Sequence, residues 1–185
     1  MTSSADKPEI VLYTACTLDG YIARPDGNLD WLFSIPSTED HGYTDLIAST
    51  SCIIMGRKTY SDLLGLITDW PYTGTPTYVM TSEGSFMPST PDTYRLSGDL
   101  RPAVMELLSR QKKNIWLAGG GKVVSWFLAN DLIDRMIISV VPVILGEGIR
   151  LFLKETGESS WNMVKAVPYS TGIVNLTYVR KHKIR

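Results

Sequence analysis

The sequence predicts an α/β fold with a mixed, mainly parallel sheet of seven or eight strands and helices on both faces. Strand-like apolar runs alternate with amphipathic helical segments over residues 1–130, a pattern typical of parallel strands joined by right-handed crossovers. The chain then continues in strands only, which indicates an antiparallel hairpin at one edge of the sheet. Two glycine-marked turns, at residues 55–59 and 117–122, each join a buried strand to a helix.

The elements follow from the hydrophobic pattern and the punctuation of the chain. Residues 17–31 contain the turn-forming pairs Asp-Gly and Pro-Asp-Gly-Asn and are predicted to form a long loop. Short apolar and β-branched runs predict six strands: 10–16, 52–55, 77–81, 93–96, 114–118 and 135–141. Helical periodicity predicts four helices. The first covers residues 38–49 with Ser37 or Thr38 as cap, and the second covers residues 58–64 and ends at Gly65. The third is capped by Asp99 and runs to Arg110, and the fourth ends at Asn130. Residues 161–168 and 172–181 form the expected terminal hairpin.

Composition indicates one domain at residues 9–185 after a polar tail at residues 1–8. Apolar residues make up 44% and charged residues 20% of the 185 residues, and the net charge is −1. Such a balance gives no electrostatic reason to expect binding to nucleic acid or to an anionic membrane. Because the tail has no apolar signal core and the longest apolar stretch is too short for a bilayer, we expect a cytoplasmic protein.

The two cysteines, Cys16 and Cys52, each lie in an apolar strand-like run. Buried free thiols in a reducing compartment are therefore expected. His41 and His182 are the only histidines, and no spacing of cysteine and histidine resembles a metal site.

The turn at residues 55–59 has the features of a phosphate-binding site. A strand that ends in glycine and opens a helix directs free backbone N–H groups and the positive end of the helix dipole to one point. Gly56 would let the backbone approach a phosphate, Thr59 would donate to it, and Arg57 could bind it through two parallel hydrogen bonds. The alternative is that Gly56 serves tight strand–helix packing, with Arg57 and Lys58 solvated.

The second turn contains three consecutive glycines, Gly119, Gly120 and Gly121. Each costs about 0.5–1 kcal/mol relative to alanine, so the run indicates unusual dihedral angles or a closely approaching ligand, with close packing as the alternative. It is not a P-loop, since the earlier glycine of that motif is missing and Val123 replaces the magnesium-binding Ser or Thr. Nor is it a G-x-G-x-x-G fingerprint, because position 124 is valine. Two such turns favour a ligand with separated phosphates, such as a dinucleotide.

Six segments in order carry a resemblance to a known superfamily. Residues 53–60 and 116–121 resemble the two cofactor-binding junctions of dihydrofolate reductase. Four further segments resemble the reductase domain of bifunctional riboflavin-biosynthesis proteins and its stand-alone relatives: 17–23, 28–32, 132–134 and 142–148. The resemblance implies a dihydrofolate-reductase-like three-layer α/β/α sandwich, NADPH as hydride donor, and a cis peptide bond between Gly119 and Gly120.

The resemblance also implies which residues contact NADPH. Arg57 would contact the adenosine 2′-phosphate with Lys58 as a helper, and Gly56 and Thr59 would hold the pyrophosphate from one side. The remaining expected contacts are Ala118, Gly119, Gly120, Gly121, Lys122 and Val123 on the other side of the pyrophosphate, Met80, Thr81 and Ser82 at the adenosine, and Ala15 and Ile22 at the nicotinamide.

Two carboxylates are candidates for handling the proton that accompanies hydride transfer. The interval from Gly56 in the dihydrofolate reductase pattern points to Asp40; the alternative is an ordinary acid in the first turn of a helix. Asp30 precedes Trp31, whose ring could form a wall of the substrate pocket. A carboxylate beside that ring would have a raised pKa and could relay a proton, although Asp30 could also be a plain helix cap.

The resulting hypothesis is an NADPH-dependent reductase resembling 5-amino-6-(5-phosphoribosylamino)uracil reductase, acting on a small polar heterocycle or carbonyl compound. Two positions depart from the family's pattern at the ribityl-phosphate site: Tyr21 stands where that family often has lysine, and Leu117-Ala118-Gly119 where it has Glu-x-Gly. That particular substrate therefore does not follow. The alternatives are a dihydrofolate reductase and a non-catalytic pyridine-nucleotide-binding sensor. A homodimer is expected, with Trp161 and Tyr178 of the last hairpin as candidate interface residues.

Overall fold

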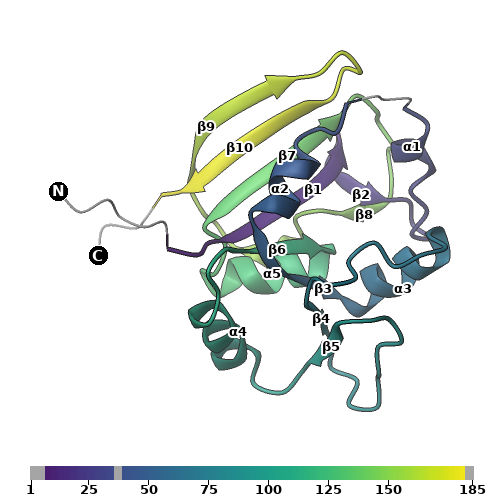
Figure 1. The fold of residues 1–185 in the computed structure, drawn as a ribbon. Helices are drawn as coiled ribbons and strands as arrows, with labels where there is room; N and C mark the ends of the chain where they lie inside the picture. Colours follow the sequence, from purple (N-terminus) through teal and green to yellow (C-terminus); the bar gives the residue numbers. More distant parts are fainter. Residues whose placement is uncertain (1–6, 36–38, 182–185) are drawn as a thin grey trace.

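An eight-stranded sheet with the order β5-β4-β3-β6-β1-β7-β10-β9 forms the centre of the protein (Figure 1). The computed structural model describes residues 7–35 and 39–181. Six strands run parallel: β1 (Ile10–Thr17), β3 (Thr50–Gly56), β4 (Thr77–Met80), β5 (Thr93–Leu96), β6 (Asn114–Gly119) and β7 (Arg135–Val141). Strands β9 (Trp161–Pro168) and β10 (Val174–Arg180) form the antiparallel hairpin at one edge. The predicted sheet is thus confirmed, with eight strands.

Helices cover both faces of this sheet because neighbouring residues of each strand point to opposite sides. On one face, Val104 of α4 (Leu100–Ser109) and Phe127 of α5 (Gly121–Ala129) pack with Leu12, Ile54 and Leu117. On the other face, α2 (Tyr43–Ala48) and α3 (Arg57–Leu66) bury Leu46 and Tyr60 against Ile53, Met55 and Trp116. The short helix α1 (Asp30–Phe33) and a 3₁₀ turn, η1 (Lys154–Thr156), complete the elements.

The prediction of a long loop at residues 17–31 was incomplete, since only residues 18–20 and 24–29 lack helix or strand. Strand β2 (Tyr21–Ala23) lies in it and pairs with β8 (Ile149–Arg150), and α1 begins at its end. The Arg150 guanidinium lies 4.7 Å from the centre of the Tyr21 ring and donates to the Tyr21 hydroxyl. Strands of three and two residues are too short to show the alternation of apolar and polar residues that predicts a strand.

Helix boundaries differ from the prediction where the backbone leaves the helical region. Helix α2 begins at Tyr43, because His41 and Gly42 adopt φ angles of 52° and 85°. The predicted caps at residues 37 and 38 lie outside the described residues. Helix α3 runs past Gly65 to Leu66, and Asp99 holds the N-cap position of α4 without a side-chain capping bond.

Other features of the chain agree with expectation. Cys16 and Cys52 are buried and free. Within the described ranges, no helix has the length and apolar character needed to cross a membrane.

Candidate functional site

A cleft of about 820 Å³ opens at the carboxyl ends of the parallel strands. It receives residues from β4, β3, β6, β1 and β7, which lie side by side in the sheet. In open α/β sheets, ligands bind in the crevice outside the carboxyl ends of the strands. The cleft is therefore the candidate functional site.

Two helices begin next to one another at this cleft. Gly56 is the N-cap of α3 and Gly120 is the N-cap of α5, and neither helix has a side-chain capping bond. Met55 and Gly119 are register partners on the adjacent strands β3 and β6, so the two helix N-termini are neighbours. Helix geometry leaves the first backbone N–H groups without intrahelical acceptors, and the dipoles add partial positive charge. This end of the cleft is suited to a ligand with more than one phosphate.

The glycines at the two junctions allow close approach of backbone segments. A Cβ atom on Gly56 would lie 2.9 Å from Val123 Cγ2, and one on Gly120 would lie 3.2 Å from Thr59 Oγ1. On Gly121 it would lie 2.4 Å from the Arg150 carbonyl oxygen. The peptide bond between Gly119 and Gly120 is cis, as expected. Only glycine therefore fits at these positions without displacing a neighbouring atom. The two junctions form a cradle of backbone atoms.

The residues predicted to contact NADPH come together around this cradle. All of them line the cleft except Gly119, which is buried at the end of β6. Arg57 forms an ion pair with Glu83 (2.6 Å), and Lys58 forms one with Asp62 (2.9 Å). Both cations at the start of α3 thus have carboxylate partners within the protein.

The other half of the cleft is lined by residues from distant segments, among them Ala15, Asp40, His41 and Ser139; Asn175 is not one of the lining residues but bonds to two of them. Ala15, Ser139 and Asn175 are register partners across β1, β7 and β10, and Ser139 and Asn175 are buried. Ser139 Oγ donates to Asn175 Oδ1 (2.7 Å), and Asn175 Nδ2 donates to the His41 carbonyl oxygen. The Tyr13 hydroxyl donates to the same carbonyl (3.1 Å). These bonds fix the loop before α2 on the sheet and hold Asp40 and His41 at the cleft.

Asp40 lines the cleft, but its carboxylate is engaged in capping α2. It accepts hydrogen bonds from the backbone N–H groups of Gly42 (2.9 Å) and Thr44 (3.0 Å). These hydrogen bonds, with that of Gly42 the strongest cause, lower the pKa of Asp40 to about 2. Asp40 is therefore ionised at neutral pH and suited to accept hydrogen bonds rather than to donate a proton.

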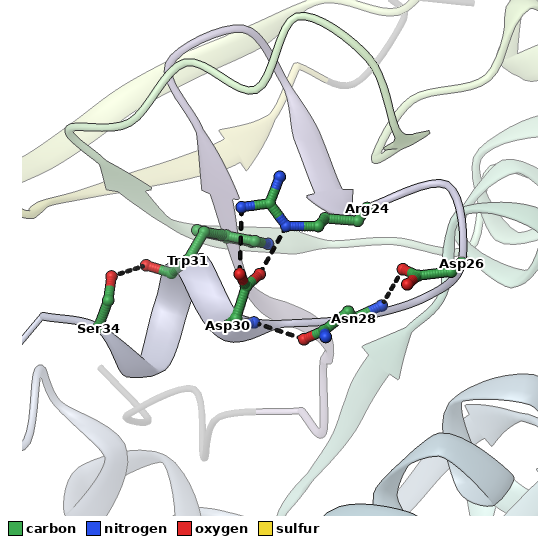
Figure 2. Close-up of polar contacts among 6 residues, drawn as sticks. All are labelled: Arg24, Asp26, Asn28, Asp30, Trp31 and Ser34. Atoms are coloured by element: carbon green, nitrogen blue, oxygen red, sulfur yellow. Dashed lines mark hydrogen bonds and ion pairs between the residues drawn. The ribbon is translucent and has the colours of Figure 1, made fainter.

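Asp30 and Trp31 do not line the cleft. Figure 2 shows the Asp30 carboxylate directed at Arg24, which donates to it through Nε (2.7 Å) and Nη2 (3.2 Å). The hydrogen bond from Arg24 lowers the pKa of Asp30, so the expected rise in its pKa was wrong. Trp31 is buried in a small core with Val141 and Ile173, both of which line the cleft. The ring therefore supports the cleft wall from behind rather than forming it.

Sequence reasoning missed Ser139, Asn175 and Glu83. Ser139 left a usable signal, since it is a polar residue inside the apolar run that follows Arg135 in β7. Asn175 left little, because Thr177 and Arg180 are also polar residues of β10. Glu83 left none, because it lies in the irregular segment after β4.

Comparison with known proteins gives a consistent result. The model of the RibD C-terminal domain family matches residues 8–175. The Bacillus subtilis (strain 168) protein YwjB, itself uncharacterized, is 36% identical over an alignment of 176 residues that covers 92% of this chain and 97% of the relative.

Solved structures share the fold. A candidate riboflavin biosynthesis protein from Shewanella sp. PV-4 has a TM-score of 0.85 at 30% identity, covering 94% of this chain and 99% of its own. A diaminohydroxyphosphoribosylaminopyrimidine deaminase/5-amino-6-(5-phosphoribosylamino)uracil reductase from Thermotoga maritima has 0.72 at 17%, covering 95% of this chain and 57% of its own. Dihydrofolate reductase from Enterococcus faecalis, complexed with NADP(H), has 0.68 at 16%, covering 95% and 98%. The three-layer fold is dihydrofolate-reductase-like, as predicted.

Proposed function

The chain belongs to the RibD C-terminal domain family, and from this premise we propose that it is an NADPH-dependent reductase of the riboflavin-biosynthesis type. The proposed reaction is hydride transfer to a small polar heterocycle or carbonyl compound. The observation that carries the proposal is the pair of glycine-capped helix N-termini on neighbouring strands at one end of the cleft. The Enterococcus faecalis relative with NADP(H) shares this fold and supports the choice of cofactor.

The residues at the cradle fit a dinucleotide. The first N–H groups of α3 and α5 would bind the pyrophosphate, and Arg57 would bind the 2′-phosphate with Lys58 beside it. Ala15 and Ile22 would lie against the nicotinamide ring, which supplies the hydride when NADPH is bound. The proposed role of Asp40, ionised and facing the cleft, is to accept hydrogen bonds from N–H groups of the substrate.

Thermal unfolding with added ligands tests the proposal. A ligand present at about 100 times its dissociation constant should add about 2.7 kcal/mol to the free energy of unfolding. We expect NADPH to stabilise strongly, NADH weakly and ATP hardly at all. Equal stabilisation by NADH and NADPH would remove the proposed role of Arg57, and no stabilisation by either would overturn the function.

A second measurement separates the proposed enzyme from its alternatives. Oxidation of NADPH, followed by its absorbance, with 5-amino-6-(5-phosphoribosylamino)uracil and with dihydrofolate as substrates distinguishes the two reductases. Stabilisation by NADPH without turnover across a panel of such compounds would instead favour a sensor of the nucleotide.

We also propose a homodimer in the cytoplasm. The two candidate interface residues, Trp161 and Tyr178, pack partly buried against the main core. Met163 and Val164 on the edge strand β9 are exposed by 59% and 55% and are better candidates for the interface. Light scattering on the purified protein tests the dimer, and Met163→Lys should shift it to monomer.

A further inference from the structure

Glu83 lies where the adenosine end of the proposed cofactor would bind. It directly follows Met80, Thr81 and Ser82, which line the cleft. Its Oε2 atom is 2.6 Å from Nη1 of Arg57, the first residue of α3. Phe86 in the same segment has its ring centre 6.0 Å from that guanidinium. The segment after β4 thus approaches Arg57 with both a carboxylate and a ring.

We propose that Glu83 competes with the cofactor 2′-phosphate for Arg57 and thereby limits the preference for NADPH over NADH. The inference rests on the proposed function, since it concerns the same site. A carboxylate and a phosphate accept charge-assisted hydrogen bonds from the same N–H edge of a planar guanidinium, so one displaces the other. A carboxylate beside the ribose tolerates the 2′-hydroxyl of NADH and opposes a 2′-phosphate.

The exposure of the pair determines how strong the competition is. The side chains of Arg57 and Glu83 are 51% and 47% exposed. Ion pairs exposed to this extent are weak, so Glu83 can turn aside when a phosphate binds. Its charge nevertheless stays within the Debye length of about 10 Å at 0.1 M salt. Glu83 therefore reduces NADPH affinity by a graded amount and does not block the site.

Lys58, the neighbouring cation, could also bind the 2′-phosphate, but it would first have to break an ion pair of its own. Lys58 follows Arg57 on α3, but its ammonium group lies 2.9 Å from Asp62 one turn later. Recruiting Lys58 to the 2′-phosphate would break that pair. The charge balance at the start of α3 is thus set by two cations and two carboxylates, and Glu83 is the carboxylate on the adenosine side.

Calorimetric titration of four proteins with matched ligands tests the inference. The proteins are wild type, Glu83→Gln, Arg57→Ala and the double variant. The ligands are NADPH, NADH, adenosine 2′,5′-bisphosphate and 5′-AMP. We expect Glu83→Gln to tighten NADPH and the bisphosphate about two- to fivefold, the range of a weak surface ion pair. NADH and 5′-AMP should be unchanged. The gain should shrink at 1 M salt, where the Debye length falls to about 3 Å, and should vanish in the Arg57→Ala background.

A matched control removes the same charge elsewhere. Glu106 forms an exposed ion pair with Arg110 on α4, outside the residues that line the cleft, and Glu106→Gln should leave all four affinities unchanged. Glu83→Ala should reproduce Glu83→Gln. The inference is overturned, while the proposed function stands, under any of three outcomes. Loss of the carboxylate could weaken the binding of NADPH, it could strengthen the binding of NADH as much as that of NADPH, or it could strengthen the binding of NADPH even in the Arg57→Ala background. If wild type binds none of the four ligands, both are overturned.

Discussion

The two halves of the cleft use a helix N-terminus in opposite ways. At the proposed cofactor half, α3 and α5 begin with glycines and have no side-chain cap. At the other half, the carboxylate of Asp40 accepts hydrogen bonds from the first N–H groups around α2. An anion from outside the protein can therefore bind at α3 and α5, whereas at α2 the protein supplies the anion itself.

This difference explains why the halves have different electrostatic character. The first half is made of backbone and cations and is suited to phosphates. The second half is lined by the ionised carboxylate of Asp40 and by Ser139, which donates to the buried Asn175. It is suited to a substrate that donates hydrogen bonds. Substitutions that act on one half and spare the other test this division.

The largest expected effect comes from Gly121. A Cβ atom there would meet the Arg150 carbonyl oxygen at 2.4 Å, and a backbone neighbour moves only with its strand. We expect Gly121→Ala to cost about 3 kcal/mol of unfolding free energy, the upper end for overpacking. Stabilisation by NADPH should also be lost. Denaturant unfolding with and without the nucleotide measures both.

Gly65 provides the matched control for this prediction. It lies in α3, is exposed and has open space where a Cβ would be. Gly65→Ala should therefore stabilise the protein by about 0.5–1 kcal/mol. If Gly121→Ala behaved like Gly65→Ala, the cradle would not depend on close backbone approach.

The ease of prediction also differs between the halves. Each turn of the cofactor half is a contiguous run of residues, so its glycines and the start of its helix could be recognised together. The substrate half joins Tyr13, His41, Ser139 and Asn175 from separate segments, and His41 and Asn175 alone are 134 residues apart. Nothing local indicates that Asn175 binds the carbonyl of His41, because the contact exists only once β10 has paired with β7.

The same reason accounts for the errors at Asp30. Its neighbour Trp31 suggested desolvation, but local sequence did not indicate that the ring would turn inward while the carboxylate turned outward to Arg24. The two-stranded ribbon of β2 and β8 was missed because strands this short have no pattern of their own. Length, periodicity and turn chemistry therefore predicted the sheet, whereas the orientation of individual polar side chains required the packed structure.

The next prediction concerns the affinity of the cofactor half. Arg57→Ala removes the charge-assisted hydrogen bonds proposed for the 2′-phosphate and should cost about 1.5–3 kcal/mol in NADPH binding. NADH binding should change little, since NADH carries a hydroxyl at that position. Arg101→Ala on α4 removes the same charge away from the cleft and serves as control. Equal losses for both nucleotides would place Arg57 elsewhere on the cofactor.

Asn175 tests the other half. Asn175→Ala removes the acceptor of the Ser139 Oγ hydrogen bond and one of the two described donors to the His41 carbonyl, and loss of buried hydrogen bonds of this kind costs about 1–3 kcal/mol. Because Asn175 holds the loop that carries Asp40, we expect weaker substrate binding, while NADPH affinity stays within about twofold. Asn162→Ala on the exposed edge strand is the control, and should change stability by less than about 0.5 kcal/mol. A large loss of NADPH affinity would show that the halves are coupled.

The dependence of stability on pH tests the lowered pKa of Asp40. Its pKa in the folded protein is about 2, below the usual 3.8. A carboxylate with a lowered pKa contributes stability that is fully present above its unfolded value and is lost as pH falls through the folded value. The melting temperature of wild type should therefore fall more steeply than that of Asp40→Asn between about pH 4 and pH 2.

The smallest expected effect is at Asp30, which the sequence suggested as a proton relay. Its carboxylate is 54% exposed, pairs with Arg24 and does not line the cleft. Exposed ion pairs contribute little, so Asp30→Asn should leave turnover and NADPH affinity within about twofold of wild type. Arg24→Ala should give the same result, because it breaks the same pair from the other side. If Asp30→Asn abolished turnover while NADPH still bound and Arg24→Ala had no effect, Asp30 would act in the chemical step, and the division of the cleft would have to include the loop before α1.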